Sequence, residues 1–194
     1  SLRLILVIGQ YTDLDLVLAD LHFDARQQLF PWDKTWFARD LMHGHVKKVI
    51  VWTGFLLMSA ALFDLASPLR MLDVPRRAGL RVLALSSALE PMLIRTLKDS
   101  ANLHCPWGVD RYNGSHPFLR LLDAVPDGWA AGHCFPAGHA STAMWLSAFA
   151  VFWLPHNPRR ATQVLLAGLG AGLILGWVQQ MRGQHFLTHT LWTA

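Results

Sequence analysis

The chain has 194 residues, of which 53% are hydrophobic and only 15% are charged. Soluble domains usually carry about 25% charged residues, so the composition argues against a water-soluble protein and predicts one membrane-embedded domain over residues 1–194. A net charge of +4 suits either nucleic acid or an anionic membrane surface. Because the background is apolar, we expect contacts with membrane lipids and none with nucleic acid.

The first segment is an apolar run, Leu2–Ile8, and three aspartates follow it before Leu21. We therefore expect the first half of residues 2–21 to lie in the membrane. The sequence starts and stops inside apolar stretches. We expect both ends to be trimmed, with a sixth membrane helix cut short at Ala194.

Three later stretches are candidates for membrane-spanning helices, which need about 20 largely apolar residues. Val49–Phe63 contains no charged residue, and Lys47 and Lys48 before it can extend their side chains toward the membrane surface. Ala137–Pro158 contains no ionisable side chain except histidines, and Ala161–Met181 contains none. All three are expected to be helices.

A fourth stretch, Leu80–Leu97, is interrupted by Glu90 and Arg95. Charged residues inside a span usually face the interior of the helix bundle. We expect these two side chains either to form a buried structural pair or to lie near a functional site. Together the stretches predict an all-α bundle of about six transmembrane helices with the sixth truncated.

Basic residues in short loops predict which helix ends share a membrane face, because such loops tend to stay in the cytoplasm. Two connections carry them, with Arg70, Arg76, Arg77 and Arg81 around residues 67–79, and Arg159 and Arg160 beside the turn at 157–158. Residues 98–136 and 182–189 then lie together on the opposite, outer face. The basic residues at positions 26–48 argue against this orientation.

Three polar clusters fall on the predicted outer face. They are Lys98 with His104–Pro106, Pro136–His139, and Arg182–His185 with His189. Cleavage of a phosphate ester without a metal needs cations, backbone donors and two imidazoles. Lys98 and Arg182 can neutralise phosphate oxygens. The amides of Ala137, Gly138 and His139 lie where a helix is expected to begin, which is a natural anion site.

The order of these motifs resembles the three-part signature of the type 2 phosphatidic acid phosphatase superfamily. The chain has Lys-x6-Cys-Pro ending at Pro106, Pro-Ala-Gly-His ending at His139, and Arg-Gly-Gln-His-Phe-Leu-Thr-His ending at His189. The family has Lys-x6-Arg-Pro, Pro-Ser-Gly-His and Ser-Arg-x5-His-x3-Asp. The resemblance covers residues 98–189. It implies a six-helix membrane core and metal-independent hydrolysis through a phosphohistidine, with no cofactor.

Carried over position by position, the resemblance implies that Lys98 holds the phosphate, His139 is the general acid and His185 is the nucleophile. Two departures concern the first two motifs. Cys105 stands at an arginine position, which removes one phosphate ligand, and Ala137 stands at the serine position. The alanine removes a hydroxyl but keeps the backbone amide.

Two further departures concern the third motif. Gln179 stands at its arginine position, but Arg182 lies three residues further on nearly the same helix face and could supply the cation. His189 stands at the aspartate position, where a neutral ring could accept a hydrogen bond and fix the tautomer of His185. In an alternative register His189 is the nucleophile and Thr193 is its partner.

Other histidines and the cysteines leave alternatives open. His185 and His189 have the spacing of metal ligands, which His104 or His139 could complete, but no neighbouring carboxylate or Cys-x2-Cys supports a metal site, so none is expected. We interpret four other histidines as interfacial (His43, His45, His116 and His156). Two more are neighbours of the motifs and are either substrate-binding or structural (His104 and His133).

Cys105 and Cys134 both belong to the predicted outer segment, each beside a motif. In an oxidising compartment they could form a disulfide that holds the first motif against the second. The alternative is two free thiols.

The sequence therefore predicts a multi-pass protein of a bacterial inner membrane, with its active site facing the periplasm. The predicted reaction is hydrolysis of a lipid-linked phosphate monoester or pyrophosphate. A lipid phosphotransferase would carry the same motifs, and the departures also allow a non-catalytic, lipid-binding relative. A haem- or metal-binding membrane protein is a third class. Neither the lipid nor the oligomeric state can be predicted.

Overall fold

A computed structural model describes residues 2–126 and 128–194, and within them the regular structure is entirely helical. The helices are α1 (Leu2–Tyr11), α2 (Leu14–Asp20), α3 (Lys47–Ala66), α4 (Val74–Asp99), α5 (Gly138–Met144), α6 (Pro158–Met181) and α7 (Leu187–Leu191). A π-helical segment, η2 (Trp36–Val46), leads into α3, and a 3₁₀ segment, η5 (Trp145–Trp153), continues α5. Three short 3₁₀ turns are η1 (Pro31–Lys34), η3 (Pro106–Gly108) and η4 (Asp110–Tyr112). The all-α prediction is confirmed.

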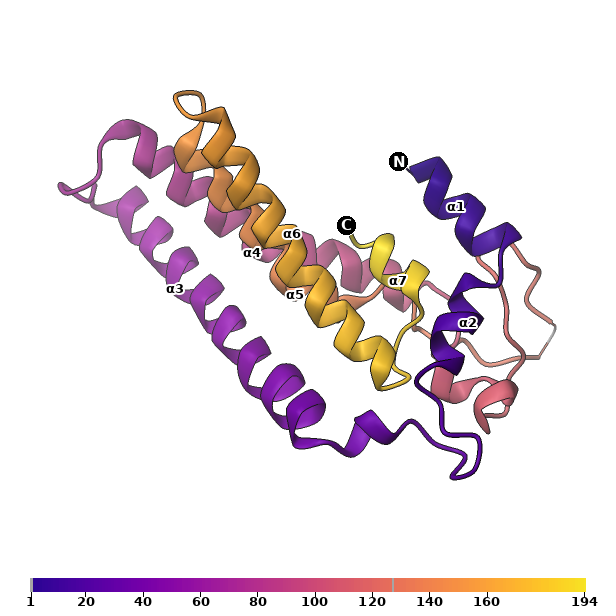
Figure 1. The fold of residues 1–194 in the computed structure, drawn as a ribbon. Coiled ribbons are helices and arrows are strands. Elements are labelled where there is room, and N and C mark those ends of the chain that lie inside the picture. The colour runs from indigo at the N-terminus through magenta and orange to yellow at the C-terminus, as the bar shows by residue number, and fades with distance from the viewer. Residues whose placement is uncertain (1, 127) are drawn as a thin grey trace.

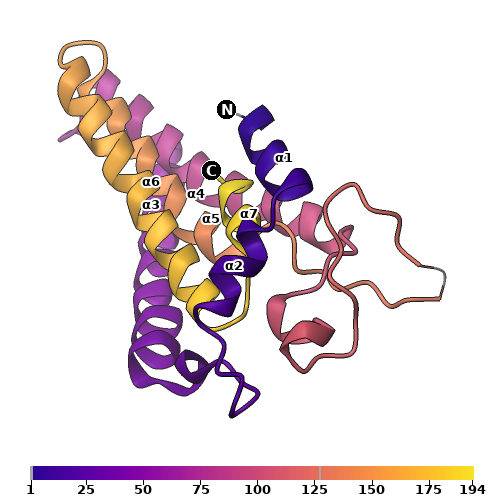
Figure 2. The ribbon, with the colours of Figure 1, turned by 45° about the vertical axis from the view of Figure 1, so that its right-hand side comes forward.

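Four long elements run beside one another and alternate in direction: α3, α4, α5 with η5, and α6 (Figure 1). The connections at 67–73 and 154–157 lie at one end of this bundle. Helices α1, α2 and α7 and the long segment 100–137 lie toward its other end (Figure 2). As predicted, residues 98–126, 128–136 and 182–189 therefore share an end.

Two helices are long and apolar enough to cross a membrane, judged by length and composition alone: Trp36–Ala66 and Pro158–Met181. They contain two of the predicted stretches. The stretch Ala137–Pro158 instead forms α5 and η5, and 3₁₀ helix rises more per residue than α-helix. Gly138–Trp153 therefore reaches about 28 Å, close to the hydrocarbon thickness of about 30 Å. Six transmembrane helices are not shown.

Glu90 and Arg95 do not form the buried pair that was one of the two expectations for them. Arg95 Nε lies 3.8 Å from Asp99 Oδ2, and both side chains are exposed. Five positions along an α-helix turn the side chain by about 140°, so Glu90 and Arg95 cannot share a face of α4. The N-terminal segment also differs from a single helix, because it breaks at Thr12–Asp13 into α1 and α2.

A buried carboxylate fastens α3 to α4 at the 67–73 end. The Asp64 side chain is fully buried, and its Oδ2 accepts a hydrogen bond of 3.0 Å from Arg81 Nη2. Arg77 Nε lies 3.3 Å from Oδ1, which also accepts from the Leu69 amide at 3.0 Å. These basic residues therefore neutralise a structural charge.

Small residues on α6 bring three elements together. Gly168, Gly172 and Gly176 recur every four residues, and a Cβ at these positions would collide with Ser147, Met144 and Thr190, respectively. Such close approach needs a residue without a side chain. Gly170, in contrast, has open space beside it. Helix α6 thus holds α5 and α7, which carry His139 and His189.

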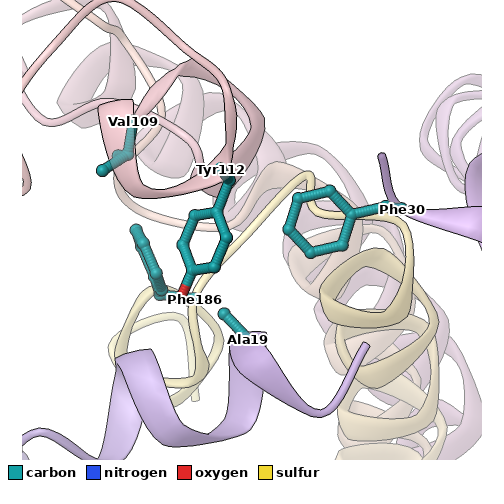
Figure 3. Close-up of a cluster of buried hydrophobic side chains, with 5 residues drawn as sticks. All are labelled: Ala19, Phe30, Val109, Tyr112 and Phe186. Atoms are coloured by element: carbon teal, nitrogen blue, oxygen red, sulfur yellow. The ribbon is translucent and has the colours of Figure 1, made fainter. Parts of the chain in front are cut away.

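An aromatic cluster packs α2, Phe30 and the segment around η4 onto the loop after α6. Figure 3 shows the rings of Phe30, Tyr112 and Phe186 converging, with Ala19 of α2 and Val109 beside them. Tyr112 Oη donates a hydrogen bond of 3.0 Å to Asp20 Oδ1, and the Arg111 guanidinium donates to both Asp20 oxygens. The Arg111 hydrogen bonds lower the pKa of Asp20.

Candidate active site

The predicted motif residues meet where the long helices end near the 100–137 segment. Lys98 lies in the last turn of α4, His139 in the first turn of α5, and His185 in the loop that follows α6. The ring centroids of His139 and His185 are 6.3 Å apart, and those of His185 and His189 are 5.9 Å apart. The structure thus brings the three motifs into one cluster.

His185 is buried, with 3% of its surface exposed. Burial is the main cause that holds the pKa of His185 well below its usual value, followed by the neighbouring His189, while the backbone carbonyl of Cys134 opposes the shift. The ring is therefore neutral near pH 7 and keeps a nitrogen lone pair. Its Nδ1 lies 3.5 Å from Cys134 Sγ.

His189 does not take the expected role toward His185. Its ring meets His185 edge to face, as it does Phe135 and Phe186. Among the residues that the structure describes, no hydrogen bond joins the two imidazoles, and Nδ1 of His189 lacks a partner. The sulfur of Cys134, rather than His189, lies at Nδ1 of His185.

In the alternative register, His189 is the nucleophile and Thr193 its partner, but the Thr193 hydroxyl does not contact the His189 ring. Thr193 Oγ1 lies 3.0 Å from the backbone carbonyl oxygen of His189 and 3.2 Å from that of Ala137. It also accepts a hydrogen bond of 3.1 Å from the Ala137 amide. These contacts place the Thr193 hydroxyl on backbone groups instead of the His189 imidazole.

His139 has two cationic or titratable neighbours that the motifs do not include. Lys47 Nζ lies 3.5 Å from His139 Nε2, and the His43 ring centroid lies 4.4 Å from that of His139. His43, which we interpreted from the sequence as interfacial, thus contacts a motif residue. Lys47 looked like a flanking residue of a span. Only the packing of the η2–α3 junction against α5 places it in the site.

Arg182 ends α6 and is 7% exposed. Its Nη1 donates to Gln179 Oε1 at 3.1 Å, which confirms that these side chains share a face. Its Nε and Nη2 donate to Asp33 Oδ1 at 3.1 and 2.8 Å. Three of its five N–H groups are thus engaged within the protein, and Asp33 compensates its charge.

The expected anion site at the start of α5 is smaller than predicted. The Ala137 amide donates to the His189 carbonyl at 2.9 Å and to Thr193 Oγ1, so it is not available to a phosphate. A Cβ at Gly138 would meet no atom within 4 Å. Gly138 therefore has open space beside it.

Two interactions hold the segment that carries His185 and His189. Asp15 of α2 accepts hydrogen bonds from the Thr188 amide, at 2.9 Å, and from the Thr188 hydroxyl. Burial raises the pKa of Asp15, although these hydrogen bonds oppose the shift. Gly183 adopts a φ of 69°, and a Cβ there would collide with the Phe30 ring. Neither residue was predicted, because both act on the backbone.

A disulfide joins Cys105 to Cys134, which is the first of the two states that the sequence allowed. Both sulfurs and a His185 nitrogen lie within 4.8 Å of one another, which is a donor set suited to a metal. Sulfurs bonded to each other are not thiolates, however, and structural zinc sites use thiolate sulfur. The residues present do not fit a metal while the disulfide is intact.

His104 and His133 lie beside this disulfide, where backbone hydrogen bonds join residues 101–103 to residues 132–134. His104 Nε2 lies 3.0 Å from the Ala130 carbonyl oxygen, and its ring stacks on His116 at 3.8 Å. His133 Nδ1 lies 3.4 Å from the Lys98 carbonyl oxygen. His104 contacts the loop itself and His133 contacts the end of α4, which favours the structural interpretation over substrate binding.

Comparison with known proteins agrees with this geometry. A family model described as PAP2 superfamily matches residues 79–194, which is more than half of the chain and includes all three motifs. No curated protein and no solved structure matched the chain. Members of the superfamily are phosphatases, which supports a phosphoric ester hydrolase. The superfamily and the two apolar helices together suggest a membrane protein. The chain belongs to the PAP2 superfamily.

Proposed function

We propose that the protein is a metal-independent membrane phosphatase that hydrolyses a lipid-linked phosphate monoester or pyrophosphate through a phosphohistidine. One observation carries the proposal: a buried, neutral His185 lies beside His139, and the cations nearest to them are not neutralised. Within residues 2–126 and 128–194, Lys47 and Lys98 form no ion pair with a carboxylate. Unpaired cations in a partly buried site suit an anionic ligand.

A phosphate dianion would be held by Lys47 and Lys98, whose two charges match its own. The two unengaged N–H groups of Arg182 and the Gly138 amide could add hydrogen bonds. In the free protein the Lys47 ammonium is the group beside His139 Nε2. A bound phosphate would draw the ammonium to its oxygens and leave this nitrogen for the leaving group.

The reaction would proceed in two displacements. His139 takes up a proton when the phosphate dianion binds. His185 Nε2 then attacks phosphorus in line, the ester oxygen departs, and His139 gives that oxygen its proton. The products of this step are the lipid alcohol and a phosphorylated His185. His139, now neutral, then takes a proton from a water that attacks the phosphohistidine, which releases inorganic phosphate and restores His185.

An apolar cavity supports a lipid rather than a water-soluble ester. It has a volume of about 320 Å³ and lies between α3, α4 and α5, with Val51, Pro91, Thr142 and Trp145 among its lining residues. Val51 lies one helical turn beyond Lys47, and Thr142 one turn beyond His139. An alkyl chain attached to a phosphate at the lysines could therefore continue directly into this cavity.

The membrane and its sidedness are also part of the proposal. The basic loops at 67–79 and 157–160 lie at the end of the bundle opposite the cluster. Since basic loops tend to stay in the cytoplasm, the cluster would face the periplasm of a bacterial inner membrane.

The test is phosphate release by the purified, detergent-solubilised protein from a panel of lipid phosphates in EDTA, with His185→Ala as control. We expect release that requires His185 and ignores EDTA, together with an acid-labile, base-stable phosphoprotein. Phosphate transfer to an added acceptor lipid would identify a phosphotransferase instead. Absence of both from folded protein would contradict the proposal.

A further inference from the structure

We infer that Cys134 is a positioning residue: its disulfide sulfur accepts the Nδ1–H of His185 and so holds the tautomer whose Nε2 lone pair faces the site. The inference rests on the proposed function in taking His185 as the nucleophile. It assigns to a sulfur the task that the family motif gives to the carboxylate four residues after the nucleophile, a position held here by His189.

The contact is buried and specific. Cys134 Sγ lies 3.5 Å from His185 Nδ1; Cys134 has no exposed surface and His185 has 3%. A disulfide sulfur carries no hydrogen, so it can only accept. A favourable contact therefore requires the ring hydrogen on Nδ1, and Nε2 is then the nitrogen with the lone pair.

The other polar side chains near His185 do not compete for Nδ1. The His189 ring meets His185 edge to face, and the Thr193 hydroxyl is bonded to backbone groups. Among the side chains that the structure describes, the Cys134 sulfur is the one that lies at hydrogen-bond distance from Nδ1.

Reduction changes what this partner can do. A dithiol reductant that opens the bond is itself oxidised to a disulfide, and each protein sulfur gains one electron and one proton. The Cys134 thiol can donate its S–H to Nδ1, and the ring proton then resides on Nε2. Transfer of the thiol proton to Nδ1 instead gives a thiolate beside a doubly protonated ring. In both cases the Nε2 lone pair is lost.

The surrounding fold does not depend on the disulfide alone. Backbone hydrogen bonds pair Gly132, His133 and Cys134 with the carbonyl groups of Asn102, Ala101 and Leu103, respectively. Two more tie this region to the nucleophile segment, from Trp107 to Gly183 and from Ala137 to His189. Opening the disulfide should therefore change the partner of His185 while the loop stays in place.

The experiment compares phosphate release by the full chain before reduction, after dithiothreitol, and after reoxidation, with mass spectrometry reporting the thiols. We expect reduction to lower kcat at least about tenfold, because the wrong histidine tautomer is catalytically costly, and reoxidation to restore it. In ¹⁵N NMR spectra, reduction should lower the population of the His185 tautomer that carries its proton on Nδ1. Full activity with an unchanged tautomer in reduced protein would overturn the inference.

Variants separate positioning from simple cross-linking. Cys105→Ala leaves a thiol at Cys134, whereas Cys105→Ala with Cys134→Met leaves a sulfur that cannot donate, and neither has the disulfide. We expect the thioether variant to be the more active. Equal activity of the two folded variants would assign the disulfide a cross-linking role only. His185-dependent release by oxidised wild type is the reference, and its absence would refute the proposed function separately.

Discussion

The two ends of the helix bundle differ in whether their basic side chains are paired with a carboxylate. At the 67–73 end, Arg77 and Arg81 both contact the buried Asp64, which ties α3 to α4. At the other end, Lys47 lies beside His139, and neither it nor Lys98 pairs with a carboxylate in the described residues. Compensated charge serves structure, whereas uncompensated charge is available to an anion.

Arg182, at the end that carries the histidine cluster, is paired with a carboxylate and still has free hydrogen-bond donors. Asp33 compensates its charge, as Asp64 does for the far arginines, yet two of its N–H groups are not engaged. Its guanidinium therefore shapes the turn that leads to His185 and can still contribute hydrogen bonds to a phosphate. The comparison predicts large kinetic effects at one end and effects on stability at the other.

The largest effect is expected for His139→Ala. Without a general acid, kcat on a lipid alkyl phosphate should fall by about 10²- to 10⁴-fold. An aryl phosphate, whose leaving group needs no proton, should lose much less. Steady-state assays on both substrates check this, with His156→Ala at the opposite end as the matched control. Equal losses on the two substrates would remove His139 from the role of acid.

The lysines come next. Lys47→Met and Lys98→Met should each lower kcat/KM by about 10²-fold, because each removes a charge that stabilises the phosphoryl group in the transition state. Lys48→Met is the control, since Lys48 is adjacent in sequence but exposed. If Lys47→Met behaves like Lys48→Met, the uncompensated charge at this end is not functional.

The free energy of unfolding should depend on pH through the buried His185. The folded-state pKa of His185 is lowered by burial, so below about pH 6.5 the unfolded chain binds a proton that the folded chain does not. Stability then falls with decreasing pH, by up to about 1.4 kcal/mol per pH unit for this proton. Thermal unfolding of wild type and His185→Gln between pH 8 and pH 5 measures it. Identical slopes for the two proteins would contradict a neutral, buried His185.

The smallest kinetic effect is expected at the far end. Asp64→Asn should lower the thermal midpoint, because two arginines lose their partner, but activity per folded molecule should stay within about twofold, since distant sites act independently. Arg76→Gln, at an exposed position nearby, is the control for stability. A selective loss of turnover in Asp64→Asn would break the separation between the two ends.

Local patterns in the sequence were sufficient to predict the long helices and the end of the bundle that the motifs share. The uncharged runs within 49–63 and 161–181 became helices because apolar residues of that length have no better way to satisfy their backbone groups in a membrane. In a bundle whose helices alternate in direction, every second connection lies at the same end. The clusters around Lys98 and His185 therefore had to meet, and this could be predicted without knowing any contact.

The contacts inside the cluster were decided by tertiary structure. His43 and Lys47 reach His139, and Asp33 reaches Arg182, because segments far apart in sequence pack together. The Ala137 amide was expected to bind phosphate but is engaged by the His189 carbonyl.

Sequence by itself therefore determined which residue types gather at this end of the bundle. Only the tertiary structure determined which partner each polar atom takes, including the sulfur at His185 Nδ1. The physical reason is that hydrophobic periodicity acts over one helical turn, whereas a hydrogen bond is decided by atoms that only folding brings within about 3 Å.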